Sequence, residues 1–170
     1  MLQGFKETVF KNKLNRLLAQ RDKSRTPPLT KVKTIAIITS EDISSKIDFQ
    51  KEIEKMLGAR NVKIYSLRKF NKKDAFSYKH FTKKEINWSG QFTEPSFQGF
   101  LKTPFDLLIG YFNTNNLYLE RAVLASKAAF KVGFAGVNSN LYEIEISEKI
   151  ENMTTFTSEL KRYLQIIKKL

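Results

Sequence analysis

The chain of 170 residues contains no cysteine and a single histidine, His80. The absence of cysteine excludes disulfide bonds, thiolate catalysis, iron–sulfur clusters and cysteine-type zinc sites, and one histidine excludes any site that needs two imidazoles. No apolar run approaches the roughly 20 residues of a membrane-spanning helix, and the first residues, MLQGFKETVF, lack the features of a signal peptide. We therefore expect a cytoplasmic protein without a metal centre or a bound cofactor.

Residue patterns that carry chemistry are also scarce. The turns that follow the expected strands contain neither GxGxxG nor GxxxxGK[ST], which disfavours dinucleotide and P-loop sites. Glu41 and Asp42 are neighbours whose side chains diverge on extended backbone, so they do not form an acid–base pair. His80 lies among aromatic and basic residues, and an exposed or packed histidine is its simpler interpretation. We expect a protein that is not an enzyme.

Positive charge is abundant and unevenly distributed. The chain has 30 Lys and Arg against 17 Asp and Glu, a formal net charge of +13. Residues 1–33, the N-terminal cluster, carry nine basic and two acidic groups, and residues 60–84, the internal cluster, carry nine and one. Residues 34–59 carry three and five, and residues 85–170 carry nine of each. Two such clusters exceed what solubility requires and favour a polyanionic partner.

Within the N-terminal cluster, residues 3–21 are predicted to form a helix. Phe10 and Leu14 belong to one apolar stripe, while Phe5 and Val9 lie roughly opposite, and basic residues surround both stripes. This pattern is typical of an appendage rather than of a core helix. An extended linker containing two consecutive prolines follows, so we expect a basic helix and linker over 1–32 and a compact domain over 33–170.

The compact domain shows strands and helices in alternation. Apolar runs predict strands over 34–39, 62–67, 105–111, 131–134 and 141–146, and amphipathic patterns predict helices over 44–57, 116–129 and 155–170. Strands that are apolar throughout and alternate with helices indicate a parallel sheet covered on both faces. The predicted fold class is α/β, a small Rossmann-like three-layer sandwich with a mainly parallel sheet.

An aromatic and basic insertion occupies residues 70–104. Eight aromatic residues fall within positions 70–100, and we expect a hairpin around Ser89 and Gly90 and a short helix over 95–101. Lysine and arginine neutralise phosphates while aromatic faces stack on unpaired bases, so this interleaving favours nucleic-acid binding. The alternative is that these aromatics form the core of the insertion, and both interpretations stay open for Trp88, Phe92, Phe97 and Phe100.

The motifs FDLLIGYFN and ASKAAFKVGF, preceded by INWSGQF and FLKTPFD, carry a resemblance. With them the chain resembles an uncharacterised family of basic proteins of similar length from Bacteroidetes, over nearly its whole length, and that family implies no activity. The same strand–helix–strand unit, about 30 residues, is similar to part of the N-terminal domain of heptosyltransferase-like glycosyltransferases. Their donor-binding second domain has no counterpart in this chain.

Our leading hypothesis is a non-enzymatic RNA-binding protein, associated with ribosomal RNA or the ribosome through a bipartite basic surface. Alternatives are a small-ligand or sugar-nucleotide binding domain that uses the turns at 40–42 and 113–116, and a protein-interaction module. A membrane surface is disfavoured because the charges of the first helix are scattered. The proposed phosphate-contacting residues are Lys6, Lys11, Lys13, Arg16, Arg21, Lys23, Arg25, Arg68, Lys69, Lys72, Lys73, Lys79, Lys83 and Lys84, and the candidates for base stacking are Tyr78 and Trp88.

Overall fold

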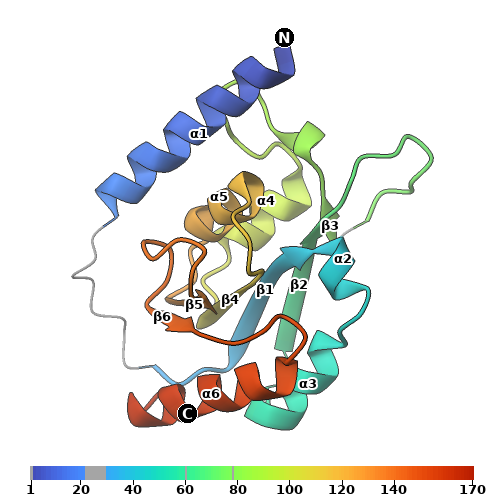
Figure 1. Ribbon diagram of the computed structural model, residues 1–170. Helices are drawn as coiled ribbons and strands as arrows, with labels where there is room; N and C mark the ends of the chain where they lie inside the picture. The colour runs from blue at the N-terminus through green and yellow to red at the C-terminus, as the bar shows by residue number, and fades with distance from the viewer. Residues whose placement is uncertain (1, 22–29, 60, 78) are drawn as a thin grey trace.

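The computed structural model describes residues 2–21, 30–59, 61–77 and 79–170 and contains a six-stranded sheet (Figure 1). Every pair of neighbouring strands is parallel, in the order β3-β2-β1-β4-β5-β6. The strands are β1 (Thr34–Ser40), β2 (Asn61–Leu67), β3 (His80–Phe81), β4 (Leu107–Tyr111), β5 (Phe130–Phe134) and β6 (Ile144–Ile146). The prediction of a parallel α/β sheet is confirmed.

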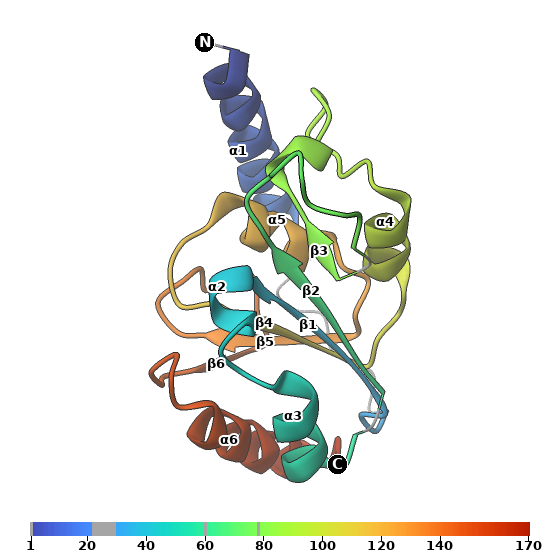
Figure 2. The same cartoon turned by 90° about the vertical axis from the view of Figure 1, so that its right-hand side faces the viewer.

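Helices cover both faces of this sheet. Figures 1 and 2 show α4 and α5 on one face, with α1 packed outside α5, and α3 and α6 on the opposite face. The helices are α1 (Leu2–Gln20), α2 (Glu41–Ser44), α3 (Phe49–Leu57), the 3-10 helix η1 (Lys83–Glu85), α4 (Pro95–Lys102), α5 (Leu117–Ala125) and α6 (Met153–Ile166). This arrangement is a Rossmann-like three-layer sandwich.

The centre of the sheet is apolar because its middle strands are buried on both faces. Ile37 of β1 pairs with Ile64 on one side and with Ile109 of β4 on the other, and Ile109 pairs in turn with Val132. All residues of β4 and β5 are buried. Continuous apolar strands of this kind are typical of parallel sheets with helices on both faces.

Tyr142, which lies within the last predicted strand, packs its ring on the sheet. The ring of Tyr142 lies against the adjacent Gly110 and Gly133, which pair in register, and a Cβ atom at either glycine would collide with that ring. Strand β6 begins only at Ile144, although the backbone N–H of Glu143 already donates a hydrogen bond to the carbonyl of Lys131 in β5, at 2.8 Å. The predicted strand over 141–146 is correct only in its second half.

The predicted helix over 44–57 corresponds to α3, which begins only at Phe49, while α2 is a separate short helix that ends at Ser44. Asp48 begins α3 by accepting a hydrogen bond from the backbone N–H of Lys51, at 3.1 Å. Gly58 ends α3 with a left-handed φ of 67°, a conformation that favours glycine. Aspartate is a common N-cap residue, so Asp48 is a local signal for the start of α3. The apolar periodicity alone does not indicate this boundary.

The prediction that α1 is an appendage is wrong. Phe10, Leu14 and Leu18 are buried and belong to the main hydrophobic core. The ring of Phe10 stacks on Tyr118 of α5 with the centroids 5.3 Å apart. One of the two apolar stripes therefore packs on the domain, while Phe5 on the other stripe is exposed. Most of the predicted linker lies outside the described residues.

The insertion is structured, as expected. An antiparallel bridge between Ile86 and Phe92 closes a tight turn at Gly90, and α4 follows from Pro95, which confirms the predicted hairpin and helix. Strand β3, only two residues long, was not predicted. Phe81 stacks on Phe97 with the centroids 4.2 Å apart, so much of the aromatic content forms a core between β3 and α4.

We predict that Phe10→Ala lowers the free energy of unfolding by about 3–5 kcal/mol, because it removes a buried ring and leaves a cavity. Phe10 is 1% exposed, whereas Phe5 on the same helix is 63% exposed, so Phe5→Ala is the matched control and should change stability little. Urea unfolding followed by circular dichroism measures both. Equal stability of the two variants would show that α1 does not pack as described.

Candidate nucleic-acid interface

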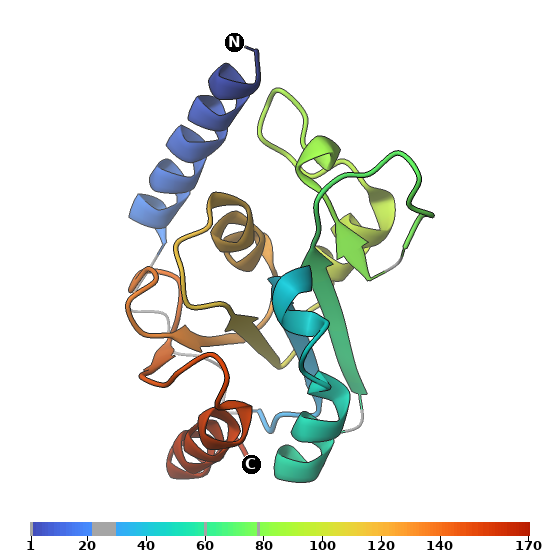
Figure 3. The same ribbon diagram turned by 45° about the vertical axis from the view of Figure 1, so that its right-hand side comes forward.

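A groove lies between the N-terminal half of α1 and the segment that contains η1 and Trp88. Its volume is about 290 Å³, and we call it the α1–Trp88 groove. Figure 3 shows α1 beside this part of the insertion. Lys6 from the N-terminal cluster and Lys83 and Lys84 from the internal cluster line it together with Trp88 and Tyr118. Two clusters that are far apart in sequence therefore meet at one groove.

Each of these lysines lies over an aromatic ring. The Nζ atom of Lys6 is 5.6 Å from the centroid of Trp88, and that of Lys83 is 4.6 Å from the centroid of Tyr118. The Nζ atom of Lys84 is 3.8 Å from the centroid of Phe70, the first residue of the insertion. A ring attracts a cation through its quadrupole but carries no formal negative charge, so these ammonium groups remain free to attract an anion.

The groove has one acidic side chain against three lysines. Glu7 lines it, but its carboxylate accepts a hydrogen bond from the hydroxyl of Tyr118, at 2.9 Å. Burial, together with this hydrogen bond, raises the pKa of Tyr118 to about 12, so the phenol stays protonated. Within the described part of the chain, no carboxylate forms an ion pair with Lys6, Lys83 or Lys84. The groove therefore carries an excess of positive charge, three lysines against the one carboxylate of Glu7.

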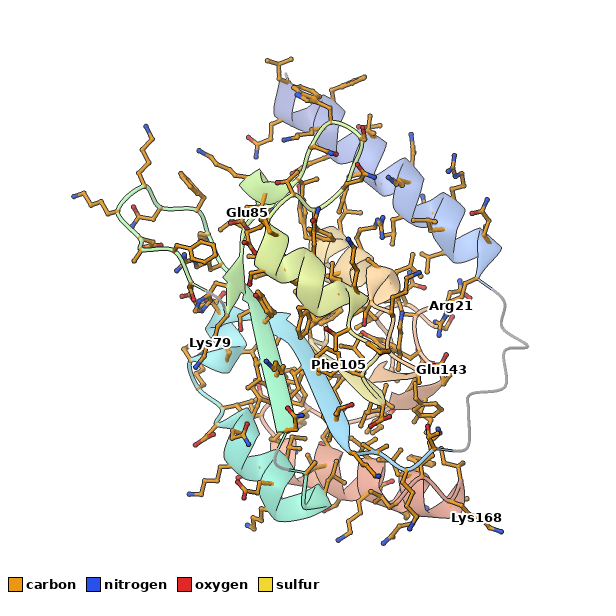
Figure 4. The ribbon with its side chains drawn as sticks, turned by 180° about the vertical axis from the view of Figure 1, so that it is seen from behind. Arg21, Lys79, Glu85, Phe105, Glu143 and Lys168 are labelled. Carbon is orange, nitrogen blue, oxygen red and sulfur yellow. The ribbon has the colours of Figure 1, made fainter. Side chains whose placement is uncertain are left out.

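The loop over residues 68–77 continues the basic surface beyond the sheet (Figure 3). The Nη2 atom of Arg68 donates a hydrogen bond to the carbonyl of Ala75, at 2.9 Å, and so closes the loop at its base. The exposed basic and aromatic side chains at this end of the sheet are Lys69, Phe70, Lys72, Lys73, Phe76 and Lys79, and one exposed carboxylate, Asp74, lies among them. Figure 4 shows Lys79 pointing outward at this end of the molecule. Contact between Lys84 and Phe70 joins the loop to the α1–Trp88 groove.

The remaining basic residues of α1 differ in exposure. Lys11 and Arg16 are exposed, whereas Lys13 is partly buried and its Nζ donates a hydrogen bond to the carbonyl of Ser89, at 2.8 Å. Burial lowers the pKa of Lys13, and the positive charges of Arg121 and Arg16 lower it further. Lys13 therefore connects α1 to the turn that follows Trp88.

Arg21 has a structural role instead. Its guanidinium donates to the carbonyl of Asn140 and forms an ion pair with Glu143, and Figure 4 shows Arg21 and Glu143 adjacent. Since this charge is already compensated, we leave Arg21 out of the proposed interface. Three other predicted residues, Lys23, Arg25 and Tyr78, lie outside the described residues.

The aromatic residues of the insertion divide into two groups. Phe92, Phe97 and Phe100 are buried, so the core interpretation holds for them. Trp88 is 54% exposed, and the ring of Phe5 lies 6.4 Å from it, centroid to centroid. The sequence did not identify Phe5 as a site residue, although its place on the second apolar stripe was a signal. Trp88 and Phe5 together offer an exposed aromatic surface beside Lys6.

A second cavity lies at the carboxyl ends of β1 and β2, beside the first residue of β3. Its volume is about 450 Å³, and Glu41, Ser44, Ser66 and His80 are among the residues that line it. The Oγ atom of Ser66 donates a hydrogen bond to that of Ser44, at 2.9 Å, and the Nε2 atom of His80 lies 3.8 Å from a carboxylate oxygen of Glu41. The sequence alone does not indicate a carboxylate near His80. Glu41 is 39 positions away along the chain and comes close only because β1, β2 and β3 pair side by side.

Protonation of His80 is disfavoured. Burial lowers its pKa, the positive charge of Arg68 lowers it further, and the carboxylate of Glu41 opposes the shift. The Nδ1 atom of His80 is hydrogen-bonded to the hydroxyl of Ser77, at 2.9 Å. His80 is therefore neutral at neutral pH and can donate or accept one hydrogen bond at this edge of the sheet.

The Asn-rich turn at 113–116 is occupied by structural hydrogen bonds. Asn116 caps α5 by accepting from the backbone N–H groups of Tyr118 and Leu119, and the amide of Asn115 donates to the carbonyl of Val137. The described residues contain no group of three or more acidic or histidine side chains that could hold a metal ion. The cavity at His80 is thus the better candidate for a small ligand.

Comparison with known proteins gives one match. No curated protein and no solved structure matches the chain. Among the described residues, no helix has both the length and the apolar character needed to cross a lipid bilayer. Residues 6–167, which include almost all of α1 and all of α6, match a family of unknown function. The chain therefore belongs to that family, DUF6913.

Proposed function

We propose that the protein binds RNA in the cytoplasm and has no enzymatic activity. One observation carries the proposal: the two basic clusters meet at the α1–Trp88 groove, where Lys6, Lys83 and Lys84 form no ion pair with any carboxylate that the structure describes. Uncompensated lysines attract a polyanion because each neutralised phosphate releases condensed counterions. The exposed ring of Trp88 beside Lys6 adds a flat aromatic surface, which phosphate binding alone does not require.

The combination of lysines and an exposed ring favours RNA with unpaired bases. Bases in loops and single strands can stack on an aromatic side chain, while bases inside a duplex cannot. The groove, about 290 Å³, is small enough that one base beside Trp88 would fill much of it. Ribosomal RNA presents both backbone phosphates and unpaired loop bases, and we propose it as the target.

We predict that replacing three groove lysines by glutamine (K6Q/K83Q/K84Q) weakens RNA binding and flattens its salt dependence. Each lost phosphate contact on a single strand reduces the slope of log K against log[salt] by about 0.7, so the slope should change by about 2. The matched control is K51Q/K55Q/K161Q, which removes three exposed lysines from α3 and α6 on the opposite face. Fluorescence anisotropy with a labelled RNA oligonucleotide at several salt concentrations measures both variants.

The control variant should bind like the wild-type chain. Equal loss of affinity in the two triple variants would contradict the groove as the site, since net charge alone would then explain binding. Co-sedimentation with ribosomes at low salt, released at high salt, is expected for the wild type. If neither RNA retention nor co-sedimentation depends on salt, the proposed function is wrong.

Trp88 provides a direct signal because it is the only tryptophan of the chain. Stacking of a base should quench its fluorescence when single-stranded RNA binds, and duplex RNA should quench less. Trp88→Ala should weaken binding of single strands by about 1–3 kcal/mol, while Trp88→Phe keeps a stacking surface and should lose less. Unchanged tryptophan fluorescence at saturating RNA would contradict the stacking role.

The cavity at His80 favours a second candidate function, binding of a small ligand such as a sugar nucleotide. Its position fits the rule that open parallel sheets bind ligands outside the carboxyl ends of their strands. We predict for this case that a nucleotide or phosphosugar raises the melting temperature of the wild type, that His80→Ala reduces this shift, and that K6Q/K83Q/K84Q keeps it. A thermal-shift screen without any stabilising compound would contradict this candidate.

A further inference from the structure

Arg121 of α5 is a largely buried cation that has no ion-pair partner among the described residues. The residue is only 8% exposed, and its Nε atom is buried and has no hydrogen-bond acceptor. Among the described residues, no carboxylate forms an ion pair with it. Burying a guanidinium without an anion is strongly unfavourable, so arginines this buried are normally paired. The fold keeps an unpaired charge where an apolar side chain would be expected.

Neighbouring charges increase this imbalance. The packing of Phe10 on Tyr118 brings α1 against α5, and Lys13 and Arg16 of α1 add positive charge on the same side as Arg121. Lys13 is held in place through its hydrogen bond to the carbonyl of Ser89. Exposure increases from Arg121, which is buried, through Lys13 to Arg16, which is exposed. The three cations therefore differ in exposure, and Arg16 and Lys13 are the ones that solvent reaches more readily.

Nearby carboxylates are engaged elsewhere. Glu120, next to Arg121 in sequence, accepts a hydrogen bond from the side-chain amide of Asn138, at 3.2 Å. Glu7, across the α1–α5 contact, accepts from the hydroxyl of Tyr118. Neither is within ion-pair distance of Arg121. A direct anionic partner for Arg121 would therefore have to come from outside the described residues.

We propose that Arg121, Lys13 and Arg16 bind one phosphate group at the junction of α1, α5 and the turn after Trp88. The planar guanidinium binds two phosphate oxygens at once, and the two flanking cations supply further charge-assisted hydrogen bonds. That the phosphate belongs to an RNA backbone rests on the proposed function, whereas affinity for a phosphate group does not. Lys13 connects this subsite to the α1–Trp88 groove, because the turn it contacts directly follows Trp88.

The test compares Arg121→Met with the wild type in chloride and in inorganic phosphate at equal ionic strength. A ligand that binds only the folded state raises the melting temperature. Phosphate should therefore raise it for the wild type and not for Arg121→Met, and in chloride the variant should be at least as stable, because it lacks the unpaired buried charge. Arg162→Met is the control: it removes an exposed arginine of α6 that pairs with Glu159, and it should keep the phosphate effect.

Two outcomes would overturn the proposal. One is a variant that is less stable in chloride yet keeps the full phosphate shift, since Arg121 would then be structural only. The other is an unchanged phosphate shift in Arg16→Gln, which alters an exposed side chain and cannot fail for want of folding.

A second arm with an RNA oligonucleotide identifies the source of the phosphate. Arg121→Met should weaken RNA binding about tenfold or more and reduce the salt slope by about 0.7 if the backbone occupies the subsite. Loss of the phosphate shift with unchanged RNA affinity would uphold the subsite and reject an RNA backbone as its ligand. Loss of RNA binding in K6Q/K83Q/K84Q with the phosphate shift retained would uphold both the subsite and the separate groove.

Discussion

The ring of Phe10 stacks on Tyr118 and meets the edge of Phe92, and this contact fixes the position of α1 relative to α5 and the insertion. Burial of the ring contributes roughly 1.5–3 kcal/mol to the docking of α1, and the buried Leu14 and Leu18 add to it. Two polar contacts, from Tyr118 to Glu7 and from Arg21 to Glu143, hold the helix near its two ends. Without this docking, Lys6 would not face Lys83 across a groove.

The same contact works against electrostatic repulsion. Docking α1 brings Lys6 and Lys13 toward Lys83 and Arg121, and like charges near a protein surface each disfavour the folded state by a few tenths of a kcal/mol. That sum is smaller than the gain from burying Phe10, so the helix stays docked. The folded protein thus keeps a concentration of like charge that its own carboxylates could have neutralised. A bound anion would offset this repulsion, which gives a physical reason for the protein to keep such charge.

How much of the fold was predictable depended on how local each signal is. Strands β1, β4 and β5 are continuous apolar runs, and the sheet follows from them. Strand β3 has two residues and exists only because it pairs with the end of β2, which no local pattern indicates. The packing of α1 was also out of reach, since the helix has two apolar stripes and only the shape of α5 selects that of Phe10. Likewise, the need for glycine at positions 110 and 133 is visible only in the structure, where the ring of Tyr142 lies on both.

The candidate site shows the same limit in terms of charge. Counting by segment located both clusters and most of the lysines that line the groove, because charge density is a property of the chain itself. Arg121 lies in the half with nine basic and nine acidic residues, where the count predicts neutrality. Coulomb interactions, however, depend on distance and are screened beyond roughly 8–10 Å in physiological salt. Most carboxylates of that half lie on other elements, and none of those described forms an ion pair with Arg121, so a balanced count and a locally unpaired cation coexist in one domain.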